Sequence, residues 1–139
     1  SACLVGSEMC IRDRGLGAVT EGVIFSTASF ATPGNPYDVF NKKYKKKYGK
    51  ENASVYPALG YDTIKIIEAA VLKARSLKGK AIRDAAAGLS DVETATAKIT
   101  YKGAKYNIPN RLVAICEMKN GQKTLVKYVQ VKPEEIPEP

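Results

Sequence analysis

The sequence predicts an α/β chain in which one strand is followed by three helices and then by a β hairpin. A run of Val, Ile, Phe and Thr within Glu21–Phe30 is typical of a strand, and the turn residues ATPGNP end it. Three stretches within Asn35–Leu89 carry apolar residues at helical spacing. Two further apolar runs flank Asn120-Gly121, a strong hairpin signal because both residues tolerate positive φ.

The first helix is expected to begin after Asn35, a suitable N-cap, with Pro36 as its first residue, and to stop at Gly49. Aromatic residues recur within it at three- and four-residue spacing and form one stripe: Tyr37, Phe40, Tyr44 and Tyr48. The lysines of NKKYKKKYGK occupy the remaining circumference. We therefore expect a buried aromatic stripe and a solvated lysine face.

The second helix, within YPALGYDTIKIIEAAVLKARS, is apolar around most of its circumference, so we expect it to be buried on more than one side. Asp62 lies near its start, where a carboxylate interacts favourably with the helix dipole. A shorter helix follows in KGKAIRDAAAGL and should end near Gly88. Its inward residues are Ile82, Ala85, Ala86 and Leu89.

After this helix the sequence pattern changes from helical spacing to that of strands. AKITY is expected to be a short strand, and Leu112–Met118 is the first arm of the hairpin. This arm is apolar on both faces, so it should lie inside a sheet and not at its rim. The closing KPEEIPEP is predicted to be an extended tail.

The N-terminal stretch LVGSEMCIRDRGLG has neither helical nor strand periodicity. Residues 4–14 match the translation of one reading frame of a common transposase sequencing adapter, and Cys3 fits the same frame. We therefore predict that residues 1–14 are non-native and exclude them from fold reasoning. The alternative is an unusual native N-terminus.

The amino-acid composition limits which catalytic and metal-binding groups the chain can provide. The 139 residues carry a net charge of +8 and contain no histidine, which removes the commonest general base and metal ligand. Outside residues 1–14 the single cysteine is Cys116, set in an apolar strand, where it is expected to be a small buried hydrophobe. We expect no enzyme activity, no metal and no cofactor. No apolar run approaches the length of a transmembrane helix.

The ordered combination of FNKKYKKKYGKENASVYPALGYDTIKIIEAA, AIRDAAAGL, TAKITY, RLVAICEMKNGQ and the final KPEEIPEP resembles the C-terminal part of type I periplasmic solute-binding proteins. More narrowly, it is similar to the branched-chain amino-acid-binding group that serves ABC importers. The resemblance covers residues 15–139. One departure is Ala97, where relatives often have glycine, so the turn that enters the ITY strand is expected to differ.

The resemblance implies a fold of two α/β lobes joined by three crossing strands, with the ligand in the cleft between the lobes. It places the second crossing at Glu21–Phe30 and the third in the final β segment, with the helices in the first lobe. Both lobes would then be incomplete in residues 15–139. The loops that hold the ammonium and carboxylate groups of the ligand, together with any signal peptide or lipid anchor, would lie upstream.

The function implied is that of a non-enzymatic, periplasmic or otherwise extracytoplasmic component of an ABC transporter. It would capture an amino acid, branched-chain or related, and deliver it to a membrane permease. One pocket residue carries over: Tyr56, five places before Tyr61, matches an aromatic position that lines the side-chain pocket of the ligand. Its hydroxyl, where some relatives have phenylalanine, argues against a purely aliphatic ligand. The alternative for Tyr56 is a core aromatic at the start of a buried helix.

Two other functions remain open from the residues. A sensory or receptor domain of the same fold would differ only in the domains attached to it. Nucleic-acid binding is suggested by the net charge and by aromatics interleaved with lysines in KKYKKKYGK. The spacing disfavours it, because tyrosines on the apolar stripe should be unavailable for base stacking; an exposed Tyr44 would favour it.

Overall fold

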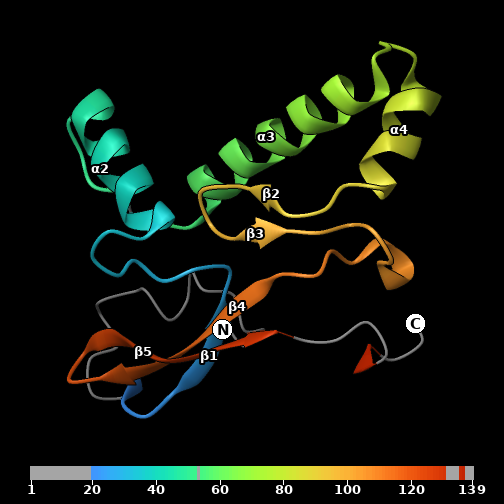
Figure 1. The fold of residues 1–139 in the computed structure, drawn as a ribbon. Coiled ribbons are helices and arrows are strands. Elements are labelled where there is room, and N and C mark those ends of the chain that lie inside the picture. The colour runs from blue at the N-terminus through green and yellow to red at the C-terminus, as the bar shows by residue number, and fades with distance from the viewer. Residues whose placement is uncertain (1–19, 53, 131–134, 137–139) are drawn as a thin grey trace, which may run out of the picture. The chain divides into compact units, whose positions relative to one another are not determined.

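The structure is a computed structural model that describes residues 20–52, 54–130 and 135–136. The segment 1–14, predicted to be non-native, lies outside the described residues. The elements follow the predicted order of one strand, three helices and a hairpin (Figure 1). They are β1 (Ile24–Thr27), α2 (Pro36–Tyr48), α3 (Tyr56–Ala74), α4 (Gly79–Ala87), β2 (Val92–Glu93), β3 (Lys98–Ile99), the 3₁₀ turn η2 (Lys105–Asn107), β4 (Leu112–Lys119) and β5 (Gln122–Gln130).

The chain divides into two compact units and passes between them three times. Among the described residues, one unit contains residues 20–27 together with Val113–Val129, and the other contains residues 28–112 together with Gln130 and residues 135–136. The first passage falls within the segment Glu21–Phe30, and the other two fall at the ends of the hairpin formed by β4 and β5. These are the two segments in which the resemblance places crossings.

The first unit is a three-stranded sheet in the order β1-β4-β5. β1 pairs antiparallel with β4, with Phe25 opposite Cys116, so the first arm of the hairpin is the central strand as predicted. Ala114, Cys116 and Met118 are buried on one face of β4, and the Cys116 side chain is fully buried. The prediction that Cys116 is a buried hydrophobe is therefore confirmed.

The turn between β4 and β5 has the predicted chemistry. Asn120 and Gly121 have φ of 52° and 69°, which is the combination required by a two-residue type I′ turn. The backbone N–H of Asn120 donates to the carboxylate of Glu21 at 3.0 Å, so the turn is also held to the residues just before β1.

In the second unit, both ends of α2 lie where the sequence predicts. The Asn35 side chain accepts a hydrogen bond from the Asp38 N–H at 2.8 Å, and Gly49, at φ 69°, caps the C-terminus through its N–H to the Lys45 carbonyl. The Asp38 carboxylate reaches back to the Gly34 N–H. A hydrogen bond from Lys42, together with that N–H, lowers the pKa of Asp38.

The aromatic stripe of α2 is only partly buried. Tyr37 lies in the core cluster with Val55, Ala58 and Ala95, while Phe40 and Tyr44 are half-buried. Tyr48, in the last turn, is 54% exposed, so the expectation that the whole stripe is buried is wrong at that end. The lysines of the run are exposed, as predicted.

The helix α3 packs against α4 and β2 through one face, which contains the buried residues Ala58, Asp62 and Ala70. Its opposite face carries exposed apolar residues, among them Ile64 and Leu72, which are 64% and 70% exposed. The prediction of burial on more than one side is therefore wrong for the described chain, because the buried residues of α3 share one face and the residues away from it stay exposed. We call Ile64 and Leu72, which lie about two turns apart, the exposed stripe of α3.

The N-cap of α2 gives a first test. Replacing Asn35 by Ala removes the acceptor for the Asp38 N–H, so we expect the free energy of unfolding to fall by about 1 kcal/mol. Urea denaturation followed by circular dichroism measures the change. The control, Lys46→Ala, alters a solvated residue of the same helix and should leave the midpoint unchanged; an equal loss in both variants would contradict the capping role.

The exposed stripe gives a second test. An apolar surface of this kind promotes association, so the purified 139-residue chain should self-associate as its concentration rises. The double substitution Ile64→Lys and Leu72→Lys should reduce that association in sedimentation velocity experiments. A matched double substitution of exposed apolar residues elsewhere, Leu77→Lys and Ile108→Lys, should reduce it less. If both pairs act equally, net charge and not the stripe controls association.

Candidate functional site

A groove of about 680 Å³ lies between α2 and α3 and is closed on one side by the residues that follow β2. Its α2 wall consists of residues three and four apart, which share one face of the helix. Its α3 wall is spaced by four for the same reason. The groove is lined by Gly34, Pro36, Val39, Phe40, Lys43, Tyr44, Lys47, Tyr48, Pro57, Tyr61, Lys65, Glu93, Thr94 and Ala95.

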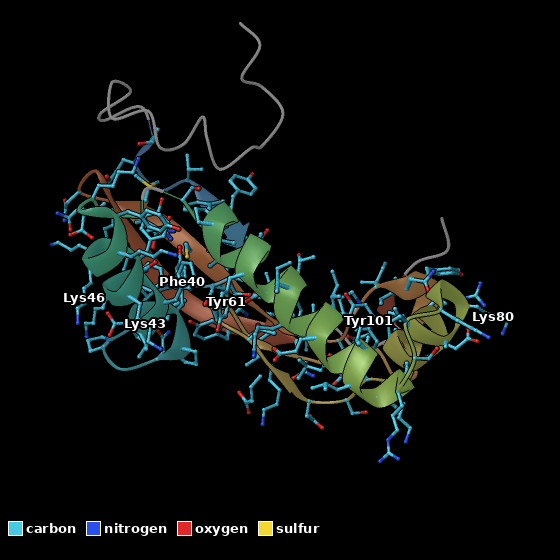
Figure 2. All side chains as sticks on the ribbon, turned by 90° about the horizontal axis from the view of Figure 1, so that it is seen from above. Phe40, Lys43, Lys46, Tyr61, Lys80 and Tyr101 are labelled. Atoms are coloured by element: carbon cyan, nitrogen blue, oxygen red, sulfur yellow. The ribbon has the colours of Figure 1, made fainter. Side chains whose placement is uncertain are left out.

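Four aromatic rings form a continuous wall of this groove. The ring centroids of Phe40 and Tyr61 are 5.6 Å apart, which joins α2 to α3, and those of Phe40 and Tyr44 are 6.1 Å apart. Tyr44 and Tyr48 follow at 4.6 Å. These separations are typical of favourable tilted aromatic pairs. Figure 2 shows Phe40 and Tyr61 between the two helices, with Lys43 beside them and Lys46 on the outer side of α2.

The charges of the groove do not cancel. Lys65 pairs with Glu68 at 2.5 Å, a hydrogen bond that raises the pKa of Lys65. Glu93 pairs with Lys98 at 3.0 Å. Lys47 lies over the Tyr48 ring, 5.3 Å from its centroid, and neither Lys47 nor Lys43 forms an ion pair with any described residue. The groove therefore has an excess of positive charge.

Asp62 fixes the turn that forms the floor of the groove. Its buried carboxylate accepts a hydrogen bond from the Ala95 N–H at 2.7 Å, and from both the N–H and the hydroxyl of Thr96. Asp62 lies beyond the first turn of α3, so the interpretation of it as a partner of the helix dipole is wrong. Its function is to hold the segment between β2 and β3 against α3.

Arg111 extends this polar cluster. Its guanidinium donates to the Thr96 hydroxyl at 2.9 Å and to the Ala28 carbonyl at 2.7 Å. Burial lowers the pKa of Arg111, and the Asp62 charge opposes that shift. The sequence contains no signal for this role, because a single arginine between two loops resembles any solvated one.

Ala97 closes the turn between β2 and β3. Its carbonyl accepts a hydrogen bond from the Thr94 hydroxyl at 2.6 Å, and its N–H donates back to that hydroxyl. Ala97 is not among the residues with positive φ, so the turn has no need of glycine at this position.

The predicted site residue Tyr56 is the first residue of α3 and is 51% exposed. It does not line the groove, although Pro57 and Tyr61 do. Tyr56 is therefore not part of the groove, and the groove itself could not be predicted from the sequence. The sequence pattern predicted that the lysines of α2 are solvated and that its tyrosines are buried. It therefore did not predict that some of these residues line the same wall of a groove.

Two negative findings concern the described residues. No group of three or more His, Cys, Asp or Glu side chains in this part of the chain is arranged to hold a metal ion. None of the helices in the described ranges combines the length and the apolar character needed to cross a membrane.

Comparison with known families identifies the class. The model of the periplasmic binding protein family matches residues 5–123, and the chain belongs to that family. It matches part of the type I fold found in solute-binding proteins of ABC importers. A comparison with curated protein sequences gives no significant match.

The chain is similar to part of several solved structures. The chain is similar to a leucine-binding protein from Thermotoga maritima, with 25% identity and a TM-score of 0.65 over 86% of this chain and 33% of that one. It has the same fold as a putative branched-chain amino acid ABC transporter protein from Rhodospirillum rubrum, at 24% identity and a TM-score of 0.63 over 88% and 35% of the two chains. A solute-binding protein of an ABC transporter from R. palustris, in complex with benzoate, gives 18% identity and a TM-score of 0.65 over 88% and 34%. The chain spans about a third of the length of these proteins.

The buried carboxylate of Asp62 gives a third test. Asp62→Asn preserves the shape of the side chain but removes the negative charge that balances Arg111. The NH₂ group of the new asparagine must also face a backbone N–H donor. We expect the free energy of unfolding to fall by about 2–3 kcal/mol. Chemical denaturation measures the loss. Asp84→Asn, which removes an exposed carboxylate of α4, is the control and should change stability little. Equal midpoints for the two variants would contradict the role assigned to Asp62.

Proposed function

We propose that this chain is part of an extracytoplasmic solute-binding protein of an ABC transporter, which captures an amino acid, branched-chain or related, between two lobes. The observation that carries the proposal is the family match over residues 5–123. The ligand-loaded protein would deliver the solute to a membrane permease. Lipid anchoring of the complete protein is part of the same proposal.

The organisation of the chain supports a hinged binder. The chain passes between its two compact units within Glu21–Phe30 and at both ends of the hairpin of β4 and β5. In a hinged protein such connections absorb the change between open and closed states, and a ligand shifts the balance toward the closed state. The non-native origin of residues 1–14 is a separate proposal, which rests on their match to a sequencing adapter, and the family match itself begins at residue 5.

Tyr56 is proposed as a wall of the side-chain pocket of the ligand. It is half-exposed, which disfavours the alternative of a core aromatic, and its hydroxyl forms no hydrogen bond with the described residues. Its hydroxyl is thus available to a ligand. A polar or aromatic side chain on the ligand would use this group better than a purely aliphatic one.

The alternative functions are supported less well. Nothing in the described residues favours a sensory domain over a transport component. Nucleic-acid binding needs accessible ring faces, but the Tyr44 ring is half-buried and lies between those of Phe40 and Tyr48.

The proposal predicts ligand stabilisation. A complete two-lobe protein that carries this chain should be stabilised against heat by at least one member of a panel of leucine, isoleucine, valine, phenylalanine, glutamate and benzoate. A saturating ligand raises the unfolding temperature because it binds the folded state alone. Thermal shift measurements test this. No stabilisation by any amino acid or related small carboxylate would contradict the proposed function.

The role of Tyr56 is tested in the same protein. Tyr56→Ala removes an aromatic wall of the pocket and should weaken the best ligand about tenfold to a hundredfold in calorimetry. Tyr56→Phe isolates the contribution of the hydroxyl. The control is Tyr106→Ala, which removes a tyrosine of comparable exposure in η2 and should leave affinity unchanged. Unchanged affinity in Tyr56→Ala would remove Tyr56 from the site.

A further inference from the structure

We propose that the groove between α2 and α3 binds an elongated carboxylate with an aromatic or aliphatic body. Nothing so far assigns a ligand to this groove. It does not include Tyr56, so the proposal is independent of the amino-acid site and of the proposed function.

The shape of the groove favours an elongated ligand. Its lining extends along α2 from Pro36 to Tyr48, which are the two ends of a 13-residue helix. At 1.5 Å per residue, such a helix is about 20 Å long. The volume of about 680 Å³ lies within the usual range for small-molecule pockets.

The walls of the groove favour an apolar body. The Phe40 and Tyr61 rings meet in its wall, while Tyr48 and Tyr61 are about half-exposed and Val39 is also exposed. Pro36 and Pro57 add rigid apolar surface at the N-terminal ends of the two helices. A ligand that covers these side chains removes apolar surface from water without moving the helices.

The charges of the groove favour an anionic end. Lys42 and Lys45 pair with Asp38 and Glu51, away from the groove. Lys43 and Lys47 are four residues apart, so they lie on the same face of α2, at the groove. Neither forms an ion pair with a described residue, and Glu93 is already paired with Lys98. A carboxylate between the two ammonium groups would neutralise one of these two positive charges.

Three ligands that share one body test the proposal: 4-phenylbutyrate, 4-phenylbutan-1-ol and 4-phenylbutylamine. Calorimetric titration of the 139-residue chain should show saturable binding of the carboxylate at least about tenfold tighter than that of the alcohol, and no saturable binding of the amine. Equal affinities for the three would overturn the proposal, since the lysines would then have no part in recognition. Absence of saturable binding of the carboxylate would overturn it too.

Two matched double variants locate the site. Lys43→Gln with Lys47→Gln should weaken the carboxylate about tenfold and leave the alcohol unchanged. Lys46→Gln with Lys50→Gln removes the same charge from exposed positions that do not line the groove, and should change affinity less than twofold. Equal losses in the two variants would reveal diffuse attraction to a basic surface and overturn the proposal. Far-ultraviolet circular dichroism confirms that each variant is folded.

The apolar wall is tested separately. Tyr61→Ala should weaken the binding of the carboxylate and of the alcohol together, because both ligands have the same apolar body.

An oligothymidylate provides the last comparison. If it displaces 4-phenylbutyrate and binds more tightly than any of the three ligands, the groove is a single-strand site and the proposal fails.

Discussion

The second unit depends on one buried carboxylate. α3 contributes Asp62, and the segment between β2 and β3 supplies three donors to it from Ala95 and Thr96. Buried donors without partners would destabilise the fold, so this segment has little freedom to move away from α3. Because Ala95 also belongs to the core cluster with Tyr37 and Val55, the same interaction fixes where α2 packs.

The groove follows from that constraint. Its floor contains Thr94 and Ala95, held by Asp62, and its walls belong to the helices that meet through the Phe40 and Tyr61 rings. Arg111 reinforces the floor from the other side of Thr96 and links it to the backbone at Ala28. A binding surface formed by three separate parts of the chain is thus supported by a polar network whose side chains, Asp62, Thr96 and Arg111, do not line the groove.

Local signals predicted the elements well, since each is decided by a few neighbouring residues. Asn35, Pro36 and Gly49 define α2 by satisfying or terminating its own backbone, and Asn120-Gly121 defines the hairpin by its backbone angles. Tertiary placement was less predictable. The apolar circumference of α3 indicated burial on several sides, but a sequence does not state which partners are present to cover each side. The role of Asp62 was missed because its donors are 33 and 34 residues away.

The lysine-rich helix shows why net charge alone does not identify a partner. Within one run, Lys42 and Lys45 neutralise carboxylates of the same unit, Lys46 faces solvent, and Lys43 and Lys47 lie at the groove. Helical geometry separates these roles, because residues four apart share a face and their immediate neighbours do not. The interleaved aromatics are mostly engaged with one another. The accessible chemistry is therefore their exposed surface and the ammonium groups of Lys43 and Lys47, which form no ion pair with a described residue. That combination suits an elongated carboxylate with an apolar body better than a chain of stacked bases.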